Sequence, residues 1–91
     1  MITPTFARGV RFRRTADGKG VLLIPEGVVE LNESAAAIIE LIDGQRTGDT
    51  IARDLSVKCA RSEADINDIK DDVDAILQRL VARSWLVDLT T

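Results

Sequence analysis

The first third of the chain alternates apolar and polar residues in the manner of short strands. Val10 and Phe12 alternate with Arg11 and Arg13, which is the period of a strand with one buried face. Two further apolar runs follow, and turn sequences rich in glycine and proline separate them. The predicted strands and turns cover residues 10–13, 17–20, 21–24, 25–27 and 28–31. Three strands in a row predict a small antiparallel sheet with at least one free edge.

After residue 31 the apolar residues recur with the period of a helix. They form three stripes, which are Ala35, Ile38, Ile39 and Ile42; then Ile51, Ala52 and Leu55; and then Ile66, Ile69, Val73, Ile76, Leu77, Leu80 and Val81. Each stripe follows a residue whose side-chain oxygen can accept a hydrogen bond from the first turn of a helix, namely Asn32, Thr47 or Ser62. The sequence therefore predicts three helices after the sheet.

Glycine and proline positions set the expected ends of these elements. Gly18 and Gly20 tolerate positive φ and are expected to turn the first hairpin. Asp43-Gly44 is expected to end the first helix, with Gly44 in the left-handed conformation that closes many helices. The third helix is expected to end near Ser84, and residues 85–87 to return as an extended apolar segment.

The fold class that follows is α+β: a small winged-helix-like domain in which a three-stranded antiparallel sheet precedes three helices. With 91 residues, the chain has apolar surface for one core, so residues 1–91 are expected to form a single domain. The N-terminus lacks a long apolar stretch, which argues against a signal peptide or membrane span. A single cysteine fits a reducing compartment, and we expect a cytoplasmic protein.

Residue types needed for most catalysis are missing from the chain. The sequence has no histidine, and its one cysteine cannot assemble a zinc or iron–sulfur site. Its glycines never reach the spacing of a phosphate-binding loop. Several aspartates of the third helix lie between the apolar positions, where a solvated face belongs. We therefore expect no enzyme activity, no metal and no cofactor.

Residues 22–47 carry a motif of fixed order and spacing. It consists of a Pro25-Glu26-Gly27 turn, a short strand that ends in Leu31-Asn32, a helix start rich in alanine, and Asp43-Gly44 before a threonine. This segment resembles the PqqD family, and the chain length and Trp85 extend the resemblance to nearly the whole sequence. Ser84 stands where the family leads us to expect a glycine.

The resemblance implies a peptide-binding module, a RiPP recognition element. Such a domain binds the precursor peptide PqqA and presents it to PqqE, a radical S-adenosylmethionine enzyme of pyrroloquinoline quinone biosynthesis. In related domains the leader of the peptide adds as a strand to the third strand of the sheet, beside the third helix. Carried over to this sequence, this implies a peptide site at Val28, Val29, Glu30 and Leu31 with Ile69 and Val73.

The residues support this binding mode, because a free sheet edge beside an amphipathic helix is the arrangement that β-augmentation needs. Val29 and Glu30 share one backbone edge, so proline at either position is expected to weaken peptide binding. Arg11 and Arg13 are a competing choice, in which charge holds acidic leader residues.

Two other functions remain as alternatives. A winged helix can bind DNA, but its recognition helix then needs basic residues, whereas residues 61–74 carry six acidic and two basic ones. Nucleic acid is therefore not an expected partner. A generic dimerisation or scaffold domain is the second alternative, because the apolar core of so short a chain is thin. Residues 8–19 are basic, and opposite charges could pair two copies of the chain. A homodimer is thus a further candidate assembly.

Overall fold

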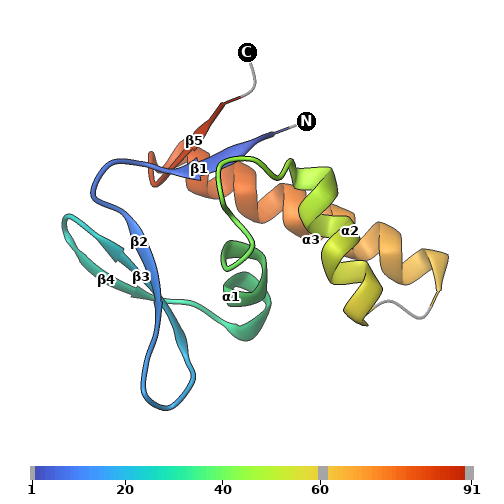
Figure 1. Ribbon diagram of the computed structural model, residues 1–91, viewed down its shortest axis with the longest axis horizontal. Coiled ribbons are helices and arrows are strands. Elements are labelled where there is room, and N and C mark those ends of the chain that lie inside the picture. The colour runs from blue at the N-terminus through green and yellow to red at the C-terminus, as the bar shows by residue number, and fades with distance from the viewer. Residues whose placement is uncertain (1, 60–61, 90–91) are drawn as a thin grey trace.

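The computed structural model describes residues 2–59 and 62–89. Its element order confirms the predicted sequence of three strands and three helices, and adds a strand near each end (Figure 1). The elements are β1 (Pro4–Phe6), β2 (Arg11–Arg14), β3 (Gly20–Ile24), β4 (Gly27–Glu30), α1 (Glu33–Ile39), α2 (Gly48–Cys59), α3 (Glu63–Ala82) and β5 (Leu86–Asp88).

Strands β2, β3 and β4 form the predicted antiparallel sheet, in that order, so β2 and β4 are its two edges. Gly18 has a φ of +87° and turns the first hairpin as expected. Gly20 does not serve as a turn residue. It is buried at the start of β3, and a Cβ there would lie 2.5 Å from the Cβ of Ala36. The prediction for Gly20 was wrong, because this glycine is needed where the sheet touches α1.

The first and last strands form a second, two-stranded sheet that the sequence pattern did not predict as such. Residues 85–87 were expected to be extended, and β5 confirms this, but its partner β1 was missed. Strand β1 has only three residues and begins with a proline, too short for alternation to be recognised. The pair joins the first and last strands and covers one end of α3 (Figure 1).

Helix α1 is shorter than predicted. It ends at Ile39 with Glu40 as its C-cap, so Ile42 is buried from the following loop rather than from the helix. Asp43 accepts hydrogen bonds from the backbone N–H groups of Gln45 and Arg46, at 2.9 and 2.8 Å. Gly44 does adopt the left-handed conformation, with a φ of +81°, but in this loop. The expected helix end at 43–44 is therefore a turn that leads into α2.

Helices α2 and α3 begin where their caps were predicted. The Thr47 hydroxyl accepts from the N–H of Thr50 at 3.1 Å, and the Ser62 hydroxyl accepts from that of Asp65 at 3.3 Å. The stripe of α3 begins later than predicted, because Ile66 is 39% exposed whereas Val73 and Leu77 are buried. The core lies where one face of the three-stranded sheet, the three helices and β5 meet.

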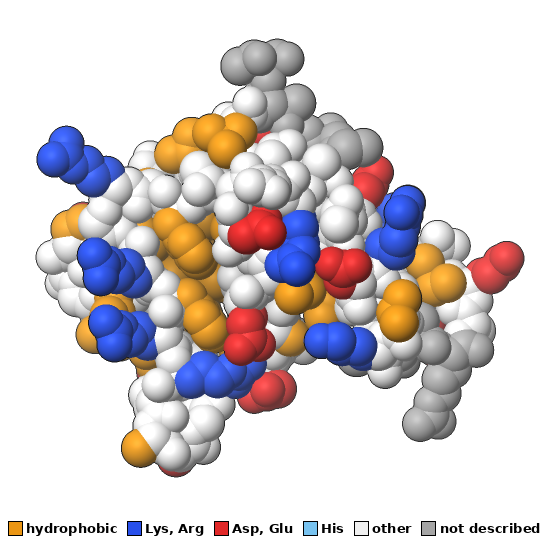
Figure 2. Space-filling view, in the orientation of Figure 1, with side chains coloured by type: hydrophobic (Ala, Val, Ile, Leu, Met, Phe, Trp, Pro, Cys, Tyr) orange, Lys and Arg blue, Asp and Glu red, His pale blue; other side chains and the backbone are white. Residues whose placement is uncertain are grey.

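Charge is unevenly distributed over the surface. Figure 2 shows Lys and Arg side chains in a column over the three-stranded sheet, with hydrophobic side chains between this column and the acidic side chains near α1. Four aspartates of α3 are exposed, as predicted for a solvated face; they are Asp68, Asp71, Asp72 and Asp74. The sheet and the last helix thus present opposite charge to solvent.

Candidate functional site

The outer edge of β4 carries backbone groups that β3 does not use. The Leu31 N–H donates to the Gly20 carbonyl at 3.0 Å. This bond establishes which residue pairs of β3 and β4 are hydrogen-bonded to each other. Because bonded and non-bonded pairs alternate in an antiparallel ladder, Val29 bonds to Leu22. The N–H and C=O groups of Val28 and Glu30 then point away from the sheet. We call these outward-pointing N–H and C=O groups the free edge of β4.

The alternation of bonded and non-bonded pairs between β3 and β4 changes the prediction made for proline substitutions. Val29 and Glu30 were treated as equivalent positions for a proline that would block an added strand. In the structure the Val29 N–H lies on the β3 side, so proline there would remove a bond within the sheet itself. Glu30 and Val28 are the positions where a proline removes an outward donor.

A groove of about 350 Å³ lies beside the free edge, and we call it the β4 groove. Its walls come from β4 and the residue after it, from one face of α1, and from the last turns of α3. It is lined by Val29, Leu31, Asn32, Ala35, Ile39, Ile76, Arg79, Leu80, Arg83 and Trp85. The lining is mainly apolar, with two arginines on the α3 side. An extended chain paired with β4 would place alternate side chains in this groove.

Trp85 is positioned by the way α3 ends. The Trp85 N–H donates to the Leu80 carbonyl at 3.0 Å, and the Ser84 N–H donates to that of Val81 at 2.9 Å. These two bonds form a Schellman motif, which needs a left-handed residue between the helix and the tryptophan. Ser84 has that conformation, with a φ of +65°. Serine therefore makes the turn for which glycine was expected.

The Trp85 ring also contacts a cation. The guanidinium carbon of Arg83 lies 5.2 Å from the centroid of the indole ring, within the range of a cation–π interaction. Neither Arg79 nor Arg83 forms an ion pair with another described residue. The α3 side of the groove thus offers an aromatic surface and two available positive charges.

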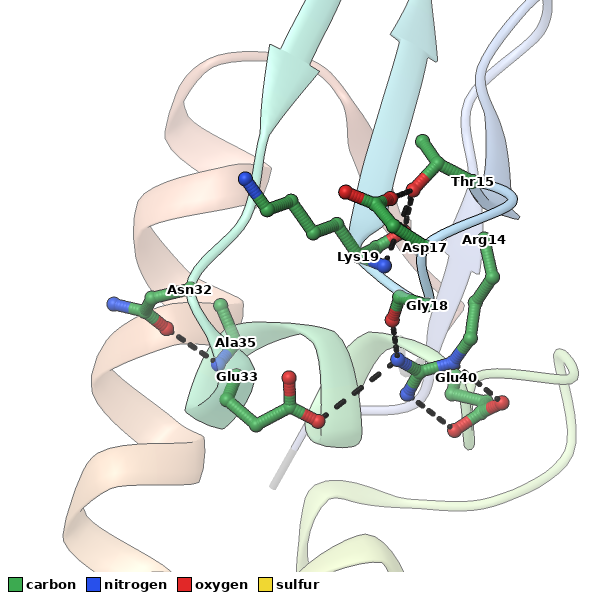
Figure 3. Close-up of polar contacts among 9 residues, drawn as sticks. All are labelled: Arg14, Thr15, Asp17, Gly18, Lys19, Asn32, Glu33, Ala35 and Glu40. Carbon is green, nitrogen blue, oxygen red and sulfur yellow. Dashed lines mark hydrogen bonds and ion pairs between the residues drawn. The ribbon is translucent and has the colours of Figure 1, made fainter.

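Asn32 joins the sheet to α1. Its side-chain oxygen accepts a hydrogen bond from the Ala35 N–H at 2.8 Å, so it is the N-cap that the sequence predicted (Figure 3). Its backbone follows β4 directly, and its side chain also lines the β4 groove. The cap therefore sets the angle at which α1 leaves the free edge.

Arg14 ties the first hairpin to α1. Its guanidinium donates to Glu40 at 3.0 Å, lies 3.9 Å from Glu33, and also bonds the Gly18 carbonyl at 2.9 Å (Figure 3). The hydrogen bond from Arg14 lowers the pKa of Glu40 and, reciprocally, raises that of Arg14. These contacts of Arg14 hold the turn of the hairpin against α1, the helix that packs on the inner face of the sheet.

The residues predicted for the peptide site are not all brought together. Val28 is 63% exposed, and by alternation it projects from the sheet face opposite the β4 groove. Val73 is 1% exposed and belongs to the core, while Ile69 lines a separate cleft between α1, α2 and α3. Arg11 and Arg13 lie on β2, the opposite edge of the sheet.

Ile69 and Val73, the residues predicted for the helix side of the peptide site, do not line the β4 groove. Ile76 and Leu80 line the groove, one to two turns beyond Val73. They belonged to the predicted apolar stripe, but a stripe does not say which of its members meets a neighbouring strand. Arg79, Arg83 and Trp85 were not predicted as groove residues, because their positions depend on how the C-terminal end of α3 lies relative to β4.

Comparison with known proteins identifies the family. Residues 19–86 match the family described as coenzyme PQQ synthesis protein D, PqqD. The chain belongs to the PqqD family. A PqqA binding protein of Stutzerimonas stutzeri is 42% identical over 84 residues, which cover 91% of this chain and 87% of that protein. One from Acinetobacter baylyi is 38% identical over 92% of this chain and 82% of that protein.

Solved structures share the PqqD fold. The NMR structure of the PqqD part of Methylobacterium extorquens PqqCD, described as a functional and stand-alone RiPP recognition element, is 32% identical. It superposes with a TM-score of 0.75 over 92% of this chain and 87% of that chain. Lasso peptide synthetase B1, solved with its leader peptide, has a TM-score of 0.73 at 20% identity and covers 93% and 98% of the two chains. At that identity the likeness shows the fold alone.

The described part of the chain shows neither a metal-ligand cluster nor a helix suited to span a membrane. Residues 2–59 and 62–89 contain no cluster of three or more potential metal-ligating side chains. None of the helices described there combines the length and apolarity that crossing a bilayer requires.

Proposed function

We propose that this PqqD-family chain binds the PqqA precursor peptide as an added strand on β4 and presents it to the enzyme PqqE. The observation that carries the proposal is the free edge at Val28 and Glu30 beside the β4 groove. Membership of the PqqD family supports it, since the relatives compared above are PqqA binding proteins. The chain then acts as a non-catalytic peptide-binding module, in the cytoplasm.

The edge and the groove have different roles in this proposal. Outward N–H and C=O groups of Val28 and Glu30 bond the peptide backbone and supply affinity without regard to sequence. Side chains of the peptide that face the β4 groove meet Ile39, Ile76 and Leu80, which favours apolar residues. Arg79 and Arg83 favour an acidic residue at the end of the groove near Trp85.

DNA binding is a weaker explanation of the same winged-helix-like fold. A duplex would need basic side chains on the exposed face of α3, because neutralising phosphates supplies most of the affinity. That face carries the exposed aspartates Asp68, Asp71, Asp72 and Asp74. Their charge would repel a duplex, and the peptide proposal needs no contact with that face.

Glu30→Pro tests the edge-pairing model. The change removes one outward N–H and blocks close approach of a new strand, while the bonds to β3 remain. We expect PqqA binding to weaken by roughly two- to tenfold, the equivalent of one backbone hydrogen bond, with any local distortion of the strand adding to the loss. Isothermal titration with the full-length precursor peptide measures it.

Glu30→Ala is the matched control, because it removes the side chain and keeps the N–H. It is expected to bind the peptide like the unmodified chain. If Glu30→Pro stays folded by circular dichroism and binds PqqA normally, edge pairing is wrong. If binding instead collapses at high salt and survives the proline, charge holds the peptide.

A further inference from the structure

The inner face of the three-stranded sheet has two grooves, and only one of them is used in the proposed function. Helix α1 lies under the sheet and divides this face, with Ile39 in the wall of both grooves. The second groove has a volume of about 560 Å³ and follows β2, so we call it the β2 groove. It is lined by Phe6, Val10, Arg11, Phe12, Arg13, Ile39, Glu40 and Ile42.

Strand β2 also has a free backbone edge. The Thr15 N–H donates to the Lys19 carbonyl at 2.8 Å, which places the next bonded pairs at Arg13–Val21 and Arg11–Leu23. The N–H and C=O groups of Phe12 and Arg14 therefore point away from β3. A second added strand could pair with them in the same manner as at β4.

The charged side chains beside the free edge of β2 indicate which side-chain pattern an added strand would need. Alternation places the side chains of Arg11 and Arg13 on the outer face of the sheet, and Phe12 on the inner face toward α1. Arg8, Arg11 and Arg13 are exposed, and none forms an ion pair with a described residue. Figure 2 shows basic side chains over the sheet beside a strip of hydrophobic ones. A strand that alternates apolar and acidic residues would complement both faces.

We infer that the β2 groove is the docking site for an extended, acidic segment of the enzyme that receives the peptide. Its apolar side chains lie over Phe12, Ile39 and Ile42, and its carboxylates lie beside Arg11 and Arg13. This inference rests on the proposed function, because presentation requires that peptide and enzyme bind at the same time. With the peptide on β4, β2 is the remaining edge of this sheet.

The test uses the full chain, the precursor peptide PqqA and the purified enzyme PqqE. The double variant Arg11→Glu/Arg13→Glu is expected to bind PqqE at least about tenfold more weakly, because two attractive pairs become repulsive. Its affinity for PqqA is expected to stay within about twofold of the unmodified chain, because the change lies on the opposite edge. Titrations of PqqE are done with the chain alone and with the peptide-loaded chain.

Two controls separate this effect from net charge and from loss of folding. Arg53→Glu/Lys58→Glu makes the same change in net charge on exposed positions of α2 and is expected to bind PqqE normally. Arg11→Lys/Arg13→Lys keeps the positive charge and is expected to retain most of the affinity. Thermal unfolding followed by circular dichroism identifies any variant that is not folded.

Several outcomes would overturn the inference. Unchanged PqqE binding by the Arg11→Glu/Arg13→Glu variant does so, as does an equal loss in the α2 control. A selective loss of PqqA affinity would place the peptide in the β2 groove, and a change from dimer to monomer in sedimentation would place a second copy there. Failure of the proposed function appears separately, as absence of PqqA binding by the unmodified chain. The PqqE titration of the free chain still decides the β2 groove.

Discussion

Single residues set the spacing of the two grooves. Gly20 lets β3 approach α1 so closely that a Cβ would lie 2.5 Å from that of Ala36, and larger residues there would separate the layers. Asn32 fixes the direction in which α1 leaves β4, and Ser84 fixes the direction in which Trp85 leaves α3. None of these residues contributes through a large buried side chain. Each acts by allowing or capping a particular backbone path.

Ser84→Gly is expected to stabilise the protein. Ser84 has a φ of +65°, a conformation that glycine adopts without the steric cost a Cβ carries. The free energy of unfolding should rise by about 0.5–1 kcal/mol, since the gain in the folded state exceeds the added freedom of the unfolded chain. Ala75→Gly, at an exposed position within α3, is the control and should lower it by about 1 kcal/mol. Urea denaturation measures both, and a less stable Ser84→Gly protein would contradict the Schellman assignment.

Asn32→Ala is expected to destabilise the fold without abolishing peptide binding. Loss of the side-chain acceptor leaves the Ala35 N–H without its cap, which should cost about 1 kcal/mol. Asn32→Asp retains an acceptor and should keep nearly full stability. Denaturation curves and a PqqA titration are compared under conditions where each variant is folded. Full stability with lost affinity would mean that Asn32 contacts the peptide instead of serving mainly as a cap.

At the scale of elements, the first hairpin is held to α1 by exposed charges as well as by packing. Arg14 reaches Glu40 and Glu33 while its backbone belongs to the free edge of β2. Exposed ion pairs are individually weak, but this one is combined with a hydrogen bond to the Gly18 carbonyl. The tie therefore limits how far the hairpin turn can move from the helix.

The lowered pKa of Glu40 predicts a specific loss of stability in acid. Because the folded state holds this carboxylate below its usual pKa, the contribution is present above the unfolded value and is lost as pH falls through the folded one. The loss should be progressive below about pH 5. Glu40→Gln should lose less stability than the unmodified chain between pH 7 and pH 3.5 in urea denaturation. Parallel losses would show that the Arg14–Glu40 contact does not contribute.

At the scale of the whole molecule, the sheet offers two edges and α1 separates the space beneath them. The β4 groove ends at α3 and Trp85, whereas the β2 groove is bounded by β1 and the loop after α1. The β1–β5 pair holds the end of α3 and so supports the wall formed by Trp85. Two extended partners could therefore occupy one small domain without competing for the same backbone groups.

The sequence by itself determined the order of the main elements and the caps, because these depend on local periodicity and on side chains that bond to nearby backbone. The N-caps at Asn32 and Thr47, the turn at Gly18 and the extended segment after Ser84 all follow from short-range chemistry. The motif of residues 22–47 also indicated the family, and it lies within residues 19–86, which match PqqD.

Only the tertiary structure decided which positions face the grooves. The outward direction of Glu30 rather than Val29 depends on the phase of the ladder, which is set by pairing with β3. Ile76 and Leu80 line the β4 groove and Val73 does not, because only the C-terminal part of α3 lies beside β4. Strand β1 was recognisable only through its partner β5. Such features arise from contacts between residues far apart in the chain, and a local sequence pattern does not predict those contacts.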